Sequence, residues 1–298
     1  MKWQGVIPAI TTPFKEDLSV DHEFLAKHAD LLVRAGCTGV VALGSLGESA
    51  TLAADEKVAV LKTVRGALEG RAPVLAGIAG LSTREACDLA RAAESAGCAG
   101  LMILPPYVYR GDDRETEAHL SAVLSATRLP CMLYNNPIAY GTDVTPPRIA
   151  ALAKRHAHLA AVKESSADVR RITELRALLK GRLALLVGVD DLILEGVAAG
   201  AAGWIAGLVN ALPNESVRLF DLAAAGKGAE ASRLYEWFLP LLRLDTVPKF
   251  VQLIKLVQAE VGLGSERVRP PRLVLAGAER AASLKLIRQA LAGRPLRR

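Results

Sequence analysis

The sequence has no apolar run long enough to cross a membrane, and only 4% of its residues are aromatic. A membrane-spanning helix needs about 18 consecutive apolar residues, and glycine, proline or a charged residue interrupts every apolar stretch of this chain before that length. The segment after Met1 has a single lysine followed by a strand-like stretch, which is not the pattern of a secretion signal. We therefore expect a cytoplasmic protein that makes no contact with a membrane.

Cysteine and histidine are also scarce, with four and five residues respectively. The cysteines show no C-x-x-C spacing, and a chain of this length does not need disulfides, so we expect them to be buried apolar side chains. His156 and His158 are near each other, but they lack the i, i+4 spacing and the acidic neighbour that are typical of a zinc site. The sequence therefore predicts neither a disulfide framework nor a bound metal.

Positive charge is in modest excess, with 37 lysines and arginines against 31 aspartates and glutamates and a formal net charge of +6. These residues are spread along the chain and often alternate in sign, which is typical of a solvated surface. The basic tail at 294–298 has no interleaved aromatic residues, so it is predicted to be a solvated end. We expect no nucleic-acid partner.

Short apolar runs are abundant, and 51% of all residues are hydrophobic, which is typical of a globular protein with a sizeable core. Eight runs have the length and composition of buried parallel strands. They are Gly5–Ile10, Gly39–Leu43, Pro73–Gly77, Gly100–Leu104, Pro130–Tyr134, Leu159–Lys163, Leu183–Val187 and Gly203–Ala206.

Segments with helical spacing lie between these runs, and several of them carry start and stop signals. Amphipathic spacing is shown by Val58, Leu61, Val64 and Leu68, and by Ile172, Leu175, Leu178 and Leu179. Ala-Gly pairs at 35–36, 96–97 and 199–200 indicate helix ends, since glycine is the natural residue for a left-handed C-cap. Ser82 with Glu85, and Thr145 with Pro146, have the pattern of helix starts. Eight alternating units favour an α/β fold of the closed (β/α)8 TIM barrel type over an open doubly wound sheet.

The strand pattern ends near residue 220, and helical periodicity continues to the end of the chain. We expect breaks in this helical part near Pro240 and around Pro270–Pro271. The sequence thus predicts a barrel catalytic domain over 1–222 and a helical C-terminal region over 223–298. This region either covers one end of the barrel or supports oligomerisation.

Three predicted strands end in unusual polar residues, at the edge where barrel active sites lie. The second strand runs into the glycine-rich segment 44–49, which is either an anion-binding turn or simply a tight βα turn. The fifth ends at Tyr134, which is either a phenol that relays protons or an amphipathic residue at the rim of the barrel. The sixth ends at Lys163, where desolvation lowers the pKa of the amine and makes it a nucleophile, although an isolated strand-end lysine is more often a surface charge.

Four segments stand out together: G-S-L-G-E-S at 44–49, Y-N-N-P at 134–137, V-K-E-S-S at 162–166 and G-V-D-D at 188–191. In order and spacing they resemble the dihydrodipicolinate synthase and N-acetylneuraminate lyase family, and the resemblance covers essentially the whole chain. It implies a class I lyase in which a lysine forms a Schiff base with a 2-oxo acid.

Carried over residue by residue, the resemblance makes Lys163 the Schiff-base lysine and Tyr134 the proton-relay tyrosine. Ser45 would hydrogen-bond into that relay, and the backbone N–H groups of Ser45 and Leu46 would hold the substrate carboxylate. Gly188 and Ile205 would line the pocket from the seventh and eighth strands. The covalent imine on Lys163 withdraws electrons from C3, so no cofactor or metal is needed. The segment 188–191 either holds polar groups of the substrate or begins a helix with aspartate in its first turn.

The sequence departs from the family pattern at three places. Dihydrodipicolinate synthases have an arginine shortly after the Tyr-Asn-x-Pro segment, whereas 138–140 reads Ile-Ala-Tyr here, which argues against a role in lysine biosynthesis. Leu46 replaces the second residue of the usual hydroxyl pair and makes the pocket wall more apolar. Val108 stands where many members have a tyrosine contributed across a subunit interface, which leaves Tyr107 or Tyr109 as a substitute.

The strings Y-N-N-P-I-A-Y-G-T-D at 134–143 and G-W-I-A-G-L-V-N-A-L-P at 203–213 resemble the 1-pyrroline-4-hydroxy-2-carboxylate deaminases of 4-hydroxyproline breakdown. The resemblance implies a small 2-oxo acid or cyclic imine as the partner, 2,5-dioxopentanoate and ammonia as products, and a homotetramer. Two alternatives stay open. One is an aldolase or dehydratase of the dihydrodipicolinate synthase or 2-keto-3-deoxy sugar acid type, and the other is a barrel that binds a small acid without turning it over.

Overall fold

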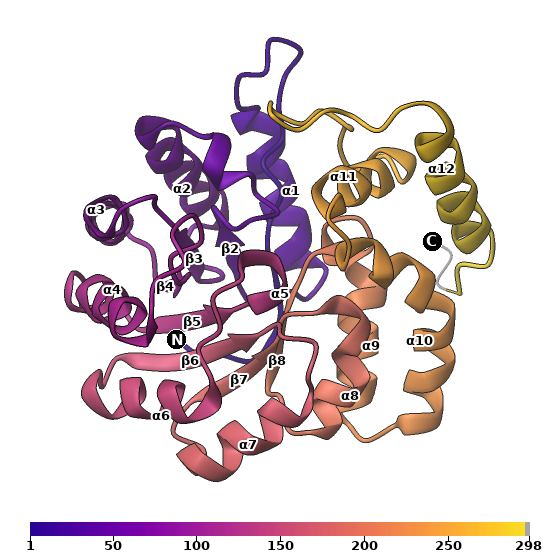
Figure 1. Ribbon diagram of the computed structural model, residues 1–298. Helices are drawn as coiled ribbons and strands as arrows, with labels where there is room; N and C mark the ends of the chain where they lie inside the picture. The colour runs from indigo at the N-terminus through magenta and orange to yellow at the C-terminus, as the bar shows by residue number, and fades with distance from the viewer. Residues whose placement is uncertain (296–298) are drawn as a thin grey trace.

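A computed structural model describes residues 1–295 as a barrel of eight parallel strands surrounded by helices (Figure 1). Neighbouring strands follow the order β1-β8-β7-β6-β5-β4-β3-β2, and a parallel bridge between Ala9 and Val41 closes the circle between the first two. The strands are β1 (Gly5–Pro8), β2 (Val40–Ala42), β3 (Val74–Ile78), β4 (Gly100–Ile103), β5 (Cys131–Asn135), β6 (Leu159–Glu164), β7 (Ala184–Val187) and β8 (Gly203–Ala206). The predicted (β/α)8 TIM barrel is confirmed, and each predicted strand overlaps an observed one.

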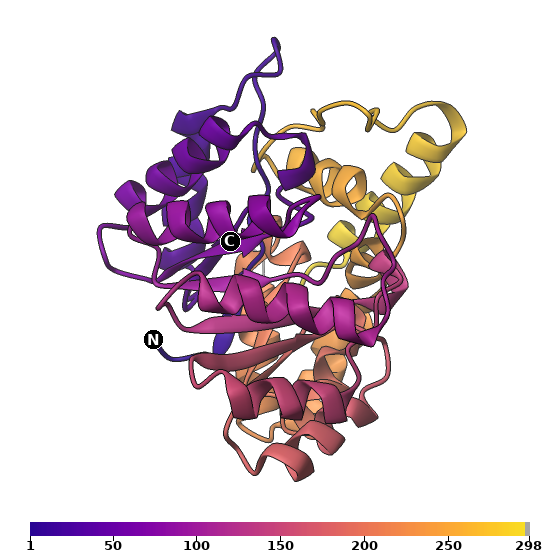
Figure 2. The same ribbon diagram turned by 60° about the vertical axis from the view of Figure 1, so that its left-hand side comes forward.

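Helices follow each of the strands, and the longer ones lie around the outside of the barrel, as the turned view shows (Figure 2). They are α1 (His22–Arg34), α2 (Ala54–Leu68), α3 (Thr83–Ser95), α4 (Asp113–Ser125), α5 (Pro137–Tyr140), α6 (Pro146–Arg155), α7 (Arg170–Leu179), α8 (Ile193–Ala198) and α9 (Pro213–Ala224). Short 3₁₀ turns are η1 (Ser49–Thr51), η2 (Asp190–Leu192), η3 (Leu208–Asn210) and η4 (Arg243–Asp245).

The helix boundaries follow the start and stop signals of the sequence. Gly36, Gly97 and Gly200 have φ values of +104°, +81° and +103°, the left-handed conformation that glycine adopts without steric cost after a helix. Ser82 caps α3 by accepting a hydrogen bond from the Glu85 backbone N–H at 3.2 Å. Leu178 does not fit its predicted place on the buried face of α7, because its side chain is exposed.

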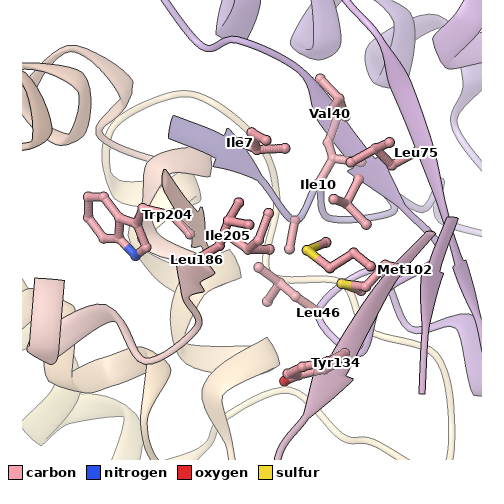
Figure 3. Packing of buried hydrophobic residues seen from close by; sticks show 14 of the residues in the cluster. Ile7, Ile10, Val40, Leu46, Leu75, Met102, Tyr134, Leu186, Trp204 and Ile205 are labelled. Atoms are coloured by element: carbon pink, nitrogen blue, oxygen red, sulfur yellow. The ribbon is translucent and has the colours of Figure 1, made fainter. Parts of the chain in front are cut away.

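The core fills the inside of the barrel and the layer between strands and helices. Side chains from several strands meet there, including Ile7, Leu75, Met102 and Ile205 (Figure 3). Leu46 and Tyr134 lie toward one end of this group (Figure 3). The interior of the barrel is therefore packed, and chemistry is confined to its mouth.

The chain continues after the barrel as a helical extension made of α10 (Gly228–Leu242), α11 (Phe250–Glu260) and α12 (Gly277–Ala292) (Figure 1). The break predicted near Pro240 lies two residues later, at Leu242, because Pro240 falls in the last turn of α10, where buried Phe238 and Leu241 hold the helix against the core. The break at 270–271 is confirmed as the long connection between α11 and α12. The division at 222/223 stays a prediction, and α9 ends at Ala224.

The structure also shows how far the cysteines are buried, what Arg294 contacts and whether any helix is long enough to span a membrane. Of the cysteines, Cys37, Cys98 and Cys131 are buried, whereas Cys87 is only partly buried. The predicted solvated tail lies outside the described residues at 296–298, and Arg294 is not fully solvated, since it pairs with the buried Glu215. No helix within residues 1–295 is long and apolar enough to span a bilayer.

Candidate active site

A cavity of about 650 Å³ opens at the carboxyl ends of the strands, and it brings together all six residues that the sequence singled out. They are Ser45, Leu46, Tyr134, Lys163, Gly188 and Ile205. They come from β2, β5, β6, β7 and β8 or the segments directly after them. Positions up to 160 residues apart in sequence therefore meet because parallel strands end at one edge.

Lys163 lies near the end of β6, and its side chain is buried in the wall of the cavity. Burial lowers the pKa of its amine, and the negative charges of Asp245, Tyr140 and Asp190 oppose this shift. The Nζ atom lies 3.9 Å from the centre of the Tyr134 ring. A lysine in this setting carries a larger fraction of neutral, nucleophilic amine than a surface lysine.

Gly188 makes room for Lys163 at the end of β7. A Cβ atom on Gly188 would lie 2.6 Å from Lys163 Cε and 1.9 Å from Ser165 Oγ, both far inside van der Waals contact. Any side chain here would push the lysine away from its position. The absence of a side chain at Gly188 is thus part of the geometry of the site.

A chain of hydroxyl groups lies on one side of Lys163. The Tyr134 hydroxyl accepts a hydrogen bond from Asn136 Nδ2 at 3.0 Å, and burial raises the pKa of this phenol to about 12. The Tyr140 ring packs edge-on against the Tyr134 ring, with 5.9 Å between ring centres. The Tyr140 hydroxyl is hydrogen-bonded to Ser45 Oγ, so Ser45 joins the tyrosines through Tyr140. Burial raises the pKa of Tyr140 as well.

Tyr140 reaches this place because of a single helical turn. Asn136 caps α5 by accepting a hydrogen bond from the Ala139 backbone N–H at 3.0 Å, and Pro137 takes the first helical position. One turn then brings residue 140 back to the side of residue 136. The sequence analysis missed this role of Tyr140, although the Asn-Pro helix start was a usable signal.

Val108 and the two tyrosines considered as substitutes for an interface tyrosine, Tyr107 and Tyr109, have different environments. Tyr107 is half-buried and packs against Tyr140, with 5.8 Å between ring centres. Tyr109 is exposed and donates a hydrogen bond to Glu115 at 3.1 Å, and Val108 is 68% exposed. Within one chain, the phenol beside Tyr134 and Ser45 is therefore that of Tyr140.

The loop after β2 has an unusual backbone. Leu43 and Glu48 have φ values of +62° and +53°, which are uncommon for residues with a side chain and cluster at functional sites. Thr12 Oγ1 donates to the Gly47 carbonyl at 2.7 Å and holds the loop from below. Within residues 1–295, the backbone N–H groups of Ser45 and Leu46 donate no hydrogen bond. Two free N–H groups beside each other suit the carboxylate of a small acid.

Buried polar side chains fasten β5 to β6 and hold the segment that carries Tyr140. Asn135 Nδ2 donates to Glu164 Oε2 and to Asp143 Oδ1, both at 3.2 Å. Arg171 makes a two-bond contact with the Asp143 carboxylate at 2.7 and 2.8 Å. The motif residue Glu164 thus supports the site from behind.

The Asp190 carboxylate is hydrogen-bonded to β8 and to the turn after it. The sequence had left two roles open for segment 188–191, binding polar groups of the substrate or beginning a helix. The Asp190 carboxylate accepts hydrogen bonds from Trp204 Nε1 at 2.9 Å and from the Leu208 backbone N–H at 2.8 Å, and it also accepts from Gly207. Burial raises the pKa of Asp190 to about 6. Asp190 therefore fixes the turn after β8, while its neighbour Asp191 lines the cavity.

The helical extension forms one wall of the cavity, which the sequence did not predict in detail. Its contribution comes from η4 and the segment up to the first turn of α11, together with one residue of the long connection after it. These residues are Asp245, Thr246, Val247, Pro248, Phe250 and Arg272. The extension therefore covers the mouth of the barrel, one of the two roles considered for it. Within residues 1–295, no three histidine, cysteine, aspartate or glutamate side chains are grouped so as to hold a metal ion.

Comparisons with known proteins place nearly the whole chain in one family. Residues 2–290 match the Dihydrodipicolinate synthetase family. The chain is 33% identical over 278 residues to a 4-hydroxy-tetrahydrodipicolinate synthase of Chlorobium chlorochromatii, covering 93% of this chain and 94% of that protein. It is 34% identical over 269 residues to the protein of the same name from Methanopyrus kandleri, covering 90% of each.

Solved structures are similar over almost the whole chain. Dihydrodipicolinate synthase from Aquifex aeolicus superposes with a TM-score of 0.92 at 27% identity, covering 99% of this chain and 100% of that one. A prophage protein of the same family from E. coli K12, solved in complex with pyruvate, gives a TM-score of 0.91 at 28% identity and covers 98% and 99% of the two chains. The chain therefore belongs to the Dihydrodipicolinate synthetase family of aldolase-type lyases.

Proposed function

We propose that this protein is a lysine Schiff-base lyase that converts 1-pyrroline-4-hydroxy-2-carboxylate and water to 2,5-dioxopentanoate and ammonia. The observation that carries the Schiff-base chemistry is the buried Lys163, whose amine has a lowered pKa and faces a cavity lined by Tyr134, Tyr140 and Ser45. A small acid that binds its carboxylate at the Ser45 and Leu46 amides has its second carbon near the lysine. Proximity of this kind is a large part of catalysis by such sites.

The steps follow from these positions. The neutral Lys163 amine adds to C2 of the cyclic imine, and the ring opens when the C2–N bond breaks toward nitrogen. Loss of a C3 proton gives an enamine, and departure of the 4-hydroxyl as water gives an unsaturated iminium on Lys163. A proton shift from C5 to C4 converts the C5 amine into an imine, and hydrolysis of that imine releases ammonia. Protonation at C3 and hydrolysis of the lysine imine then release the product. Tyr134 and Tyr140 are placed to move the protons of the first step, because they are the phenols beside Lys163.

The substrate assignment is supported by the part of the cavity wall that α5 forms. Ile138, Ala139 and Tyr140 line the cavity in the segment where dihydrodipicolinate synthases place an arginine. The one arginine among the described lining residues, Arg272, lies 4.0 Å from the buried Glu48 carboxylate. The cavity thus suits a substrate with one carboxylate.

We further propose a homotetramer as the assembled form.

A second candidate is an aldolase or dehydratase that acts on an acyclic 2-oxo acid. The names of the similar proteins from Chlorobium chlorochromatii and Methanopyrus kandleri favour it, since both are called 4-hydroxy-tetrahydrodipicolinate synthase. The same lysine chemistry would serve both reactions, because each passes through an enamine at C3.

The test combines trapping with product analysis. The protein is incubated with 1-pyrroline-4-hydroxy-2-carboxylate or with pyruvate, reduced with sodium borohydride and mapped by mass spectrometry, and ammonia is assayed in parallel. We expect an adduct on Lys163 and ammonia from the pyrroline. Lys163→Met is the matched control, and it should form no adduct. An adduct with pyruvate but no ammonia from the pyrroline would favour the second candidate, and no adduct with either would refute the Schiff-base chemistry.

A further inference from the structure

Asp245 brings a carboxyl group from the helical extension into the cavity. It lies at the end of η4 and lines the cavity together with Lys163. Its Oδ1 atom is buried and, within the described residues, has no hydrogen-bond partner. Buried carboxyl oxygens are almost always hydrogen-bonded, so an unpartnered one that lines a substrate cavity points to a ligand group.

The absence of a side chain at Gly207 leaves space for the Asp245 carboxyl group. A Cβ atom on Gly207, directly after β8, would lie only 2.1 Å from Asp245 Oδ1. Asp190, which fixes the same turn, has its hydrogen bonds satisfied by Trp204, Gly207 and Leu208. Asp190 therefore stabilises the turn after β8, whereas Asp245 faces the cavity.

The surroundings favour the protonated form of Asp245. Burial raises the pKa of Asp245 well above its usual value, the nearby Asp190 and Asp191 charges raise it further, and Lys163 opposes them. Burial thus shifts both groups toward their neutral forms, the carboxylic acid of Asp245 and the amine of Lys163. Such an acid has a proton to donate.

The circular order of the strands fixes where the parts of a substrate lie. The carboxylate loop follows β2 and Lys163 is on β6, directly across the barrel, while Tyr134 ends β5 and Asp245 lies against the turn after β8. When the substrate carboxylate (C1) is bound at the loop after β2 and C2 is bonded to Lys163, the other substituents of C2 lie either toward Tyr134 or toward Asp245. We assign the C2 heteroatom to the side of the phenols and the carbon chain beyond C2 to the side of Asp245.

We propose that Asp245 is a further catalytic residue, which donates the proton to the 4-hydroxyl group of the Lys163-bound enamine as that group leaves as water. This inference rests on the proposed Schiff-base function and names the acid of its elimination step. It applies to substrates with a hydroxyl group two carbons beyond the imine carbon.

The step is balanced. The nitrogen lone pair of the neutral enamine forms the C2=N bond, the C2=C3 pair moves to become the C3=C4 bond, and the C4–O pair leaves with the oxygen. That oxygen takes the proton of the Asp245 carboxylic acid and departs as water. The products are an unsaturated iminium on Lys163 and the Asp245 carboxylate, whose charges offset each other.

The test is Asp245→Asn, read from the mass of the trapped adduct. Wild-type protein and variant are mixed with 1-pyrroline-4-hydroxy-2-carboxylate, reduced with borohydride and analysed by mass spectrometry, with pyruvate as a substrate that has no hydroxyl to lose. We expect the variant to form both adducts, but its pyrroline adduct keeps the hydroxyl and is one water heavier than the dehydrated wild-type adduct. Ammonia release should fall about 100-fold, a typical effect of losing a general acid.

Two further variants keep the test sharp. In Gly207→Ala, the new methyl group collides with Asp245 Oδ1 and displaces the carboxyl group. This variant should therefore also give the hydrated adduct. Asp221→Asn, on the exposed face of α9, should behave as wild type. The pyruvate adduct and the thermal midpoint report whether each variant is folded.

The outcomes separate this inference from the proposed function. A variant that dehydrates its adduct as fast as the wild type refutes the role of Asp245, even if ammonia is released. A wild-type protein that dehydrates the adduct through Asp245 but releases no ammonia keeps the role and refutes the deaminase. A wild-type adduct that always retains its hydroxyl refutes the elimination and hence the role.

Discussion

The buried Lys255 amine is paired with the buried Glu48 carboxylate, and this pair fastens α11 of the extension to the loop that follows β2. Glu48 also accepts a hydrogen bond from the Arg269 backbone N–H at 3.0 Å, and Lys255 donates to the carbonyl groups of Thr12 and Arg267 at 2.8 and 2.7 Å. The carboxylate loop, with its left-handed residue at Glu48, is therefore held in shape by the C-terminal part of the chain.

Removing one member of this pair should destabilise the protein strongly. Lys255→Met removes the buried partner of Glu48 and leaves Arg272, at 4.0 Å, as the only ion-pair partner of that carboxylate among the described residues, which costs about 3–5 kcal/mol in the free energy of unfolding. Urea unfolding of Lys255→Met, of Glu48→Gln and of the double variant Glu48→Gln/Lys255→Met measures this. The double variant should be less destabilised than the sum of the two single variants. The exposed pair Lys27 and Glu23 is the control, and Lys27→Met should leave the unfolding midpoint unchanged. Additive losses would contradict a coupled buried pair.

Tyr140 should be needed for proton movement. Tyr140→Phe removes the hydroxyl that bonds Ser45 while keeping the ring against Tyr134, so kcat should fall about 100-fold with little change in KM. Steady-state kinetics of ammonia release measure this. Tyr109→Phe is the matched control, since that phenol is exposed and, within residues 1–295, forms side-chain hydrogen bonds only to Glu115. Equal activity of the two variants would remove Tyr140 from the relay.

Gly188 should tolerate no side chain. In Gly188→Ala, the new methyl group collides with Lys163 Cε and Ser165 Oγ, and a displacement of about 1 Å at a reacting group costs about 100-fold in rate. Borohydride trapping with pyruvate measures the rate of adduct formation. In contrast, Gly66→Ala in the exposed part of α2 meets nothing within 4 Å and should stabilise the protein by about 0.5–1 kcal/mol. A normal adduct rate in Gly188→Ala would show that the lysine has room to move.

His28 should make the fold sensitive to acid. It is buried on α1, with Nε2 3.3 Å from Asn210 Oδ1, and burial lowers its pKa from 6.5 to about 4. Because the folded-state pKa is depressed, the unfolded chain binds the proton more readily. The neutral histidine thus contributes stability above pH 6.5 that is lost as the pH falls toward 4, about 3 kcal/mol in all.

The measurement compares urea unfolding at several pH values in the wild type and in His28→Gln. Other acids also titrate in this range, among them Asp190 with its pKa near 6, so the difference between the two proteins is the informative quantity. The wild type should lose more stability than the variant between pH 6.5 and 4. Parallel curves would show that His28 is not the group responsible.

Local patterns were enough to place the elements and the reacting groups. Ala-Gly pairs indicated where helices end, and the short apolar runs that follow them indicated buried strands, since a glycine after a helix and a short buried run have few other uses. Lys163 and Tyr134 were found because they interrupt the ends of such runs, and parallel strands bring those ends together. Tyr140 was missed because its place depends on a turn of only four residues.

The sequence by itself determined that the chain forms a (β/α)8 barrel with a strand-end lysine at its mouth, because the period of the apolar residues and the chemistry of the motif are local properties. Only the tertiary structure decided which side of the cavity the extension covers, that Lys255 meets Glu48, and that Asp245 faces Lys163. A charged residue within an apolar helical segment signals that it needs a partner when buried. Its partner, more than 200 positions away for Lys255, is fixed by packing that no local pattern contains.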